Sequence, residues 1–438
     1  MAYGVEADYD QPMPVLEGVL DRKARLVDWL MALYLLTVGV LQATPYWRGS
    51  TYIAYAVPVI LLIQLRTNRA SRIPELWFFL AMMAWIGFTT AIATFRLASA
   101  ITAWYLIKIY IMAVFLIIVC DSLPKLLLLM RAIVLGGTVV VLVGVVAGLP
   151  SVIEGGERIG GIAENPNASA AIVLFTGLAG LMTLPFSGKL WKTYIWALLA
   201  LSLVALLGTG TRTAIICLAV VSLAYVLFEY GRHMKEHWKV IVPIVAIMIL
   251  VPYIAIRYFG DSPALRRMGD LIGQLERGRG AAADSRMQIY IHGWHLFLSH
   301  PLVGIGAGTY RFYGPGGLAH THTTFLELLV TNGIPGFLLY VGLIAGLWLR
   351  LRRLVRIFRH DRKMRNGLNA ARAFVVAFVA HGMLSTTYQS KFAIFTLAVL
   401  IGFSARLLHA VRQEEAYQVS YEESDEPASR PAWALPLS

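Results

Sequence analysis

Long runs of apolar residues, separated by short polar segments, dominate the chain. A membrane-spanning helix needs roughly 20 mostly apolar residues, because lipid leaves no partner for an unpaired backbone group. The runs predict about twelve such helices. Their expected limits are 28–44, 51–66, 75–94, 101–120, 125–149, 167–186, 190–208, 212–230, 239–256, 333–350, 371–388 and 392–410. The predicted fold class is therefore an all-α polytopic membrane protein, with a single transmembrane domain over 28–410.

Clusters of Lys and Arg give this topology an orientation. The clusters are Arg22, Lys23 and Arg25; Arg66, Arg69 and Arg72; Arg232, Lys235 and Lys239; and the arginines from Arg350 to Arg365. With twelve spans all of them fall on one side, which the positive-inside rule makes cytoplasmic. Both the N-terminal segment, 1–27, and the tail, 411–438, are then cytoplasmic, and the acidic, proline-containing tail is predicted to be disordered.

Composition supports a membrane protein and argues against other classes. Hydrophobic residues make up 58% of the chain and charged residues only 14%, against about a quarter charged in soluble domains. The net charge of +13 is explained by the cytoplasmic loops, and no basic patch with interleaved aromatics predicts nucleic-acid binding. The two cysteines, Cys120 and Cys217, lie in apolar runs and form no disulfide framework or metal motif.

Two polar segments are predicted on the opposite, outer side. The larger, 257–332, is too long for a simple connector and contains several glycine-rich turns. Within it, residues 285–298 carry apolar side chains at helical spacing and predict an amphipathic helix near the membrane interface. The smaller segment is 150–166.

Arginines on this side break the topology rule. Arg158 lies in the smaller segment, Arg212 at the start of the eighth span, and Arg286 in the larger segment beside further arginines. Guanidinium groups match phosphate oxygens, and Arg212 adjoins a helix N-terminus, which favours anions. The pattern predicts an anion site at the outer face. The alternative is structural pairing with nearby acids or lipid phosphates. Arg286 follows Asp284, whereas Arg212 has no acidic neighbour in sequence.

His320 and His322 precede an apolar helix in the sequence AHTHTTFLELL. Three functional interpretations are open: a metal pair completed by a residue such as Glu327, a general base, or a group that orients substrate. The structural alternative is helix capping by a solvated polar stretch. No nucleophile elbow, P-loop, HExxH motif or glycosidase carboxylate pair is present, so hydrolase and NTPase functions have no support.

Four stretches together resemble the bacterial O-antigen ligase family and the related polymerases and O-oligosaccharyltransferases. They are RIGGIAENPNASA (158–170), GTGTRTA (208–214), DSRMQIYIHGWHLFLSHPLVGIGAGTY (284–310) and HTTFLELLVTNGIPG (322–336). The long outer loop and the dozen spans fit as well, so the resemblance covers roughly 28–410 and extends to the GT-C-type glycosyltransferases in architecture. Where many relatives have Asn after the histidine, this chain has Thr323.

The resemblance implies a glycosyltransferase that needs no metal or other cofactor and inverts the anomeric centre. Such an enzyme moves O-antigen polysaccharide from undecaprenyl pyrophosphate to lipid A–core at the periplasmic face of the Gram-negative inner membrane, which completes lipopolysaccharide. His322 matches the family's histidine and is implied to be the general base. Arg212 and Arg286 match its arginines, and Arg158 is a further candidate for binding the donor pyrophosphate.

Other functions fit parts of the pattern. An O-antigen polymerase or a protein O-oligosaccharyltransferase would use the same donor with another acceptor. A flippase for a lipid-linked glycan would instead show inverted repeats, broken helices and charges near the middle of the membrane. No internal repeat is evident, and the unusual charges cluster at one face.

Overall fold

The structure is a computed structural model that describes residues 18–20, 24–42, 73–153, 166–209, 211–230, 242, 285–314 and 320–422. Every regular element in these ranges is helical. The elements are α2 (Leu26–Gln42), α4 (Pro74–Ile92), α5 (Arg96–Val119), α6 (Leu123–Ile153), α7 (Pro166–Thr183), η3 (Leu184–Phe186), α8 (Lys189–Thr209), α9 (Arg212–Tyr230), α12 (Ser285–Ser299), η6 (Tyr310–Phe312), α13 (Thr324–Ile357), α14 (Arg362–Leu384) and α15 (Lys391–Glu422).

The predicted fold class is confirmed. Within the described ranges, nine helices are long and apolar enough to cross a membrane, and α2 is a shorter apolar helix. The predicted spans 51–66 and 239–256 lie outside the described residues, apart from Val242. The chain is therefore an all-α, multi-pass membrane protein.

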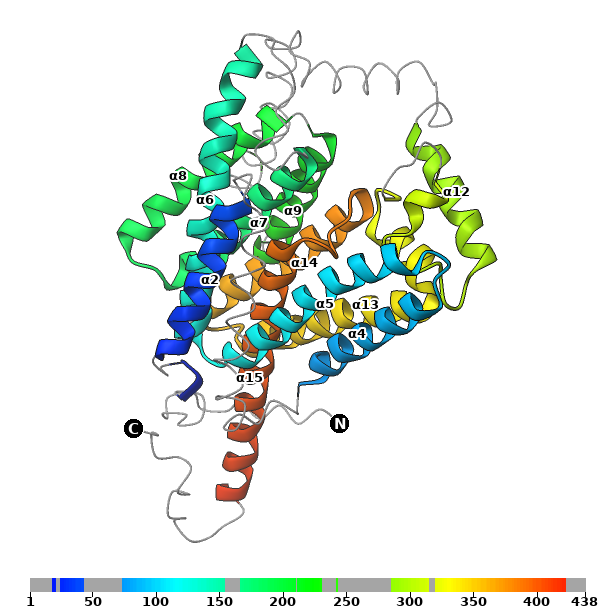
Figure 1. The fold of residues 1–438 in the computed structure, drawn as a ribbon. Helices are drawn as coiled ribbons and strands as arrows, with labels where there is room; N and C mark the ends of the chain where they lie inside the picture. Colours follow the sequence, from blue (N-terminus) through cyan, green and yellow to red (C-terminus); the bar gives the residue numbers. More distant parts are fainter. Residues whose placement is uncertain are drawn as a thin grey trace.

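Helix α15 forms the centre of the bundle. All side chains from Lys391 to Ser404 are buried, and the helix packs against α5, α6, α7 and α13 (Figure 1). By contrast, only 28% of the apolar window of α8 is buried, and α8 lies at the edge of the bundle.

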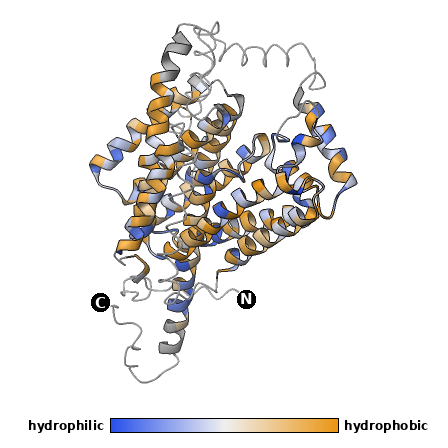
Figure 2. Cartoon of the chain, viewed as in Figure 1, coloured by the Kyte–Doolittle hydropathy of each residue, from blue (hydrophilic) through white to orange (hydrophobic). Residues whose placement is uncertain are grey.

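Three of the long helices, α13, α14 and α15, begin or end several residues away from their predicted limits. Helix α13 starts at Thr324, not at residue 333, and α14 ends at Leu384, not at residue 388. The segment between α14 and α15 folds as a loop that contacts the start of α13. Helix α15 continues to Glu422, past the predicted limit at 410, and Figure 2 shows hydrophilic residues in the last coloured turns of this helix.

Helices α2 and α6 pack closely because glycines face each other. A Cβ atom on Gly136 would lie 2.8 Å from the backbone oxygen of Leu36 and 3.1 Å from the Cα of Gly39. Small residues let two membrane helices approach in this way. Near the start of α2, the buried Lys125 bonds Asp28 at 3.5 Å and Asp121 at 2.9 Å. Helix α2 is thus fixed against α6 at two points along its length, by the ion pair near its start and by the glycine contact nearer its end.

Gly136→Val should therefore destabilise the bundle. The added methyl groups would meet backbone atoms of α2, which cannot move without separating the helices, and overpacking of this kind costs about 1–3 kcal/mol. The expected result is a lower apparent melting temperature of the purified protein in detergent. Gly87→Val is the matched control, because a Cβ at Gly87 meets nothing within 4 Å. Equal effects of the two substitutions would contradict the close α2–α6 contact.

Candidate functional site

Helix α13 is broken at Gly333, near its start. Gly333 has φ 64° and ψ −170°, and Pro335, which follows two residues later, has no N–H to donate to the carbonyl of Thr331. An open carbonyl is costly in a membrane. The break therefore needs other donors, and a neighbouring segment provides them.

The segment 301–306 replaces the hydrogen bonds lost at the break. The N–H groups of Ile305 and Gly306 donate to the carbonyls of Val330 and Thr331, both at 2.9 Å. The N–H of Ile334 in turn donates to the carbonyl of Pro301, also at 2.9 Å. The loop that follows α12 and the broken turn of α13 are therefore one hydrogen-bonded unit.

Buried polar side chains hold the broken turn against α4. The indole Nε1 of Trp85 donates to the carbonyl of Asn332 at 2.7 Å, and the hydroxyl of Thr89 donates to the Asn332 amide oxygen at 3.4 Å. The Asn332 amide donates to the Thr331 hydroxyl, which donates to the carbonyl of Glu327. The TNG part of the predicted family motif thus has a structural role.

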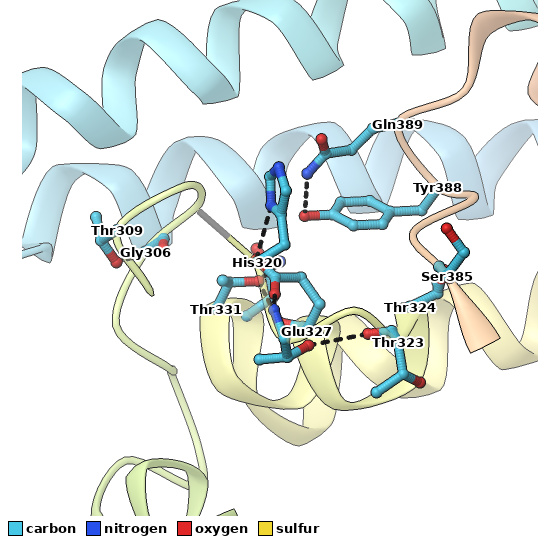
Figure 3. Close-up of polar contacts among 12 residues, drawn as sticks. Gly306, Thr309, His320, Thr323, Thr324, Glu327, Thr331, Ser385, Tyr388 and Gln389 are labelled. Atoms are coloured by element: carbon cyan, nitrogen blue, oxygen red, sulfur yellow. Dashed lines mark hydrogen bonds and ion pairs between the residues drawn. The ribbon is translucent and has the colours of Figure 1, made fainter. Parts of the chain in front are cut away.

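The polar turn before α13 carries His320 and His322. The backbone N–H of Thr321 in this turn donates to Oε2 of Glu327 at 2.7 Å, and the Glu327 side chain is completely buried. On the other side, the hydroxyl of Thr323 donates to the carbonyl of Gly382, and Thr324 bonds Ser385 and Thr387. The turn is therefore held between a buried carboxylate and the end of α14 (Figure 3).

His322 has an unusual backbone conformation. Its φ is 61°, and it is the one residue other than glycine with positive φ in the part of the chain that the structure describes. This region is unfavourable for a residue with a Cβ, and such residues are concentrated at functional sites. The hydrogen bonds of Thr321 and Thr323 on either side hold His322 in this conformation.

His320 lies over the buried Glu327. Its Nδ1 is 3.7 Å from Oε1 of Glu327, and its side chain is 35% exposed (Figure 3). The two form an ion pair when His320 is protonated. In the described ranges no group of three metal-binding residues surrounds them. Glu327 was expected only as a weak candidate for a metal ligand, whereas its observed contacts are to the backbone of the turn and to His320.

Two buried tyrosines complete the surroundings of Glu327. Burial, and then the charge of Glu327, raise the pKa of Tyr310 to about 12. The same two causes hold the pKa of Tyr388 well above its usual value, and Gln389 donates a hydrogen bond to its phenol oxygen. Both phenols keep their protons at neutral pH, so neither is a candidate base.

Helix α12 packs on the first turns of α13. Ile289, Phe297 and Val330 share a small apolar core with residues of the intervening loop, and the phenol of Tyr310 donates to the carbonyl of Ile289 at 3.3 Å. The amphipathic helix predicted over 285–298 is confirmed. Not all of its apolar side chains pack on α13, because Ile291 and Trp294, which belong to the predicted apolar spacing, remain 52% and 49% exposed.

Arg286 belongs to the first turn of α12, one turn before Ile289. Its backbone is thereby brought to the end of the bundle that contains His322, because Ile289 packs on the start of α13. The side chain of Arg286 lies outside the described part of the structure, so its contacts stay a prediction.

Arg212 is the first residue of α9. Helices α9 and α14 are antiparallel neighbours, and the far end of α9 bonds α14 through Glu229, which contacts Arg365 and Asn369. Arg212 precedes Glu229 by as many residues as Gly382 follows Arg365 (229 − 212 and 382 − 365 are both 17). Both helices rise about 1.5 Å per residue, so Arg212 lies near the level of Gly382. Gly382 accepts the hydrogen bond of Thr323, so the start of α9 is at the same end as His322.

The three predicted residues with described backbones therefore lie at one end of the bundle. His322 is described in full, whereas the side chain of Arg212, like that of Arg286, lies outside the description. Arg158 falls in the undescribed range 154–165. Sequence reasoning considered Glu327 only as a possible metal ligand, and it missed both the restraint of the turn by Glu327 and the hydrogen-bonded loop 301–306. The repeated glycines at 304, 306 and 308, each with positive φ, were the available signal for the loop.

The fold and this site define a multi-pass helical membrane protein with a polar, strained turn at one end. Residues 197–341 match the family model described as O-antigen ligase (Wzy_C). This range includes Arg212, Arg286, His322 and the broken turn of α13. The match supports the resemblance to the O-antigen ligase/polymerase superfamily that the sequence motifs predicted, over this part of the chain. No curated protein matches the chain.

Glu327→Ala should loosen the turn that carries His322. It removes the acceptor of the Thr321 N–H, and a buried donor without an acceptor costs about 1–3 kcal/mol. Hydrogen exchange of the amides at 320–324 should become faster, and the melting temperature should fall. Glu327→Gln keeps an oxygen for Thr321 and should retain most of the protection.

Glu415→Ala is the control, since Glu415 is an exposed carboxylate on α15. Unchanged exchange in Glu327→Ala would show that the buried carboxylate does not hold the turn.

Proposed function

We propose that the protein is an O-antigen ligase. It transfers O-antigen polysaccharide from undecaprenyl pyrophosphate to lipid A–core at the periplasmic face of the inner membrane and so completes lipopolysaccharide. The observation that carries this proposal is the placement of His322. It occupies a strained turn at the end of the bundle where α9 and α12 begin, with Arg212 and Arg286 in their first turns.

The donor pyrophosphate binds to Arg212 and Arg286, and Arg158 assists. Both helix N-termini present free backbone N–H groups and the positive end of the helix dipole, which favour an anion. The guanidinium groups then stabilise the negative charge that develops on the pyrophosphate as it leaves. The arginines supply this charge in place of a divalent metal ion.

His322 acts as the general base. An acceptor hydroxyl of lipid A–core attacks the anomeric carbon of the sugar attached to the pyrophosphate. The new glycosidic bond forms as the bond to pyrophosphate breaks, the hydroxyl proton passes to the His322 imidazole, and undecaprenyl pyrophosphate leaves. Attack opposite to the leaving group inverts the anomeric carbon. Glu327 contributes by fixing the turn, not by contacting substrate.

Orientation follows from the charges at the two ends of the bundle. The cationic clusters at the ends of α13 and α15 face the cytoplasm under the positive-inside rule, and both termini lie there too. The end with His322 then faces the periplasm. Both substrates are lipids and reach this end from within the bilayer.

The test is transfer by the purified protein. Undecaprenyl-pyrophosphate-linked O antigen and lipid A–core are supplied with EDTA and without nucleotide, and the larger lipopolysaccharide is followed on a gel. Wild type should form product. His322→Ala should lower the rate by about 10²–10⁴-fold, as expected for loss of a general base. Arg212→Ala and Arg286→Ala should each lower it by about 10²–10³-fold.

His295→Ala and Arg311→Ala are the controls, because both side chains are exposed near the same end and neither has a role in the proposed reaction. They should keep near wild-type rates. Normal transfer by folded His322→Ala would rule out the base assignment. Product formed on a second lipid-linked glycan, with lipid A–core untouched, would identify a polymerase instead.

A further inference from the structure

A cavity of about 440 Å³ lies between α4, α13 and α15, far from His322. Its walls come from the first turns of α4, from the stretch of α13 between Gly346 and Arg353, and from the stretch of α15 between Ala405 and Arg412. Gly346 is roughly 30 Å along α13 from Thr324, at 1.5 Å per residue. This distance is close to the thickness of the hydrocarbon core, so the cavity opens near the opposite membrane face.

Positive charge dominates the lining of the cavity. Four arginines and one histidine contribute to it: Arg350, Arg353, Arg406, Arg412 and His409. The one acidic residue among the described lining residues is Glu75, and it is already bound to Arg350 in a buried ion pair. Within the described part of the chain, Arg353 and Arg412 have no acidic partner. The cavity thus offers uncompensated guanidinium groups.

The remaining lining is apolar. Aliphatic and aromatic surface comes from Ile73, just before α4, from Phe78 of α4, from Leu349 of α13 and from Leu408 of α15. Leu349 is 61% exposed and therefore faces the surroundings of the bundle, which are lipid at this depth. A soluble anion would not bury this apolar surface, whereas the acyl chain of a lipid would.

We propose that this cavity binds an anionic phospholipid. The headgroup phosphate lies between Arg353 and Arg412, where planar guanidinium donors match its oxygens. The first part of an acyl chain lies along Leu349 and Phe78 and continues into the bilayer. Basic pockets between membrane helices on the cytoplasmic side bind lipid headgroups by this chemistry. The site is separate from the proposed transfer reaction and does not depend on it.

The test compares lipids with a matched pair of variants. The full-length protein is purified in a neutral detergent, and binding of phosphatidylglycerol, phosphatidylcholine and inorganic phosphate is measured by native mass spectrometry. Wild type should bind phosphatidylglycerol more tightly than phosphatidylcholine by about tenfold or more. Arg353→Gln combined with Arg412→Gln should weaken phosphatidylglycerol binding by a similar factor. An excess of inorganic phosphate should not displace the lipid.

The control is Arg352→Gln combined with Arg356→Gln. Arg352 and Arg356 are exposed residues of α13, the helix of Arg353, and they lie outside the cavity lining. This double substitution removes the same number of positive charges as the first. It should leave phosphatidylglycerol binding within about twofold of wild type, since screened surface charges contribute little. Arg412→Gln alone, at an exposed position, gives a second variant with little risk to folding.

Three outcomes would overturn the proposal. Equal losses in the two double variants would reduce the effect to general attraction between basic residues and acidic lipid. Equal affinity for phosphatidylcholine would remove the role of the headgroup charge. Displacement by inorganic phosphate would make the cavity a site for a soluble anion.

Discussion

The break in α13 at Gly333 is the constraint on which the candidate site depends. A membrane helix normally bonds all its own backbone groups, and the break leaves the carbonyls of Val330 and Thr331 without their usual donors. Residues 301–306 satisfy them, which fixes the loop between α12 and α13 against the bundle. Helix α12 is held in turn, because it packs on that loop and on the first turns of α13. The hydrogen bonds at the break thus determine where α12 begins relative to His322.

The break also allows a short helical segment to carry buried polar groups near the membrane surface. Glu327 and Thr331 lie between the polar turn and Gly333, and both are completely buried. In a continuous apolar span these side chains would face lipid or other helices with no partner. Here Glu327 receives the N–H of Thr321, and Thr331 joins the chain of bonds to Asn332 and Thr89. The polar residues are stable at this depth because the surrounding loops provide backbone donors.

Sequence patterns predicted the helices well and the loops poorly. Hydrophobic runs identify spans because a bilayer imposes one length and one composition on them, as α5, α7 and α8 illustrate. The start of α13 was misplaced because the span was begun only after the polar residues Thr331 and Asn332, although the apolar residues before them already belong to the helix. The polar loop before α15 was assigned partly to a span because the apolar run of α14 was extended past Leu384, yet the backbone there bonds Thr324. Such pairings join residues about sixty positions apart, and no local pattern records them.

The same limit applies to the site. His322 was predicted from a motif. Its positive φ could not be predicted, because no local sequence pattern requires that backbone conformation of a histidine. Glu327 was considered from the sequence only as a possible metal ligand, because nothing local shows that its carboxylate accepts the N–H of Thr321.

The partners of the buried acids explain why Glu327 differs from the others. Glu75 pairs with Arg350, Glu229 with Arg365, and Lys125 serves both Asp28 and Asp121. The pairs of Glu75, Glu229 and Asp28 each fix one helix to another. Glu327 instead accepts the backbone N–H of Thr321, and the His320 imidazole lies 3.7 Å from its other oxygen. It therefore holds a turn and not a second helix, and that turn is the one in which His322 takes its positive φ. The restraint on His322 thus comes from one buried carboxylate within the same polar segment, which is why the turn keeps its shape where the helix itself has not yet begun.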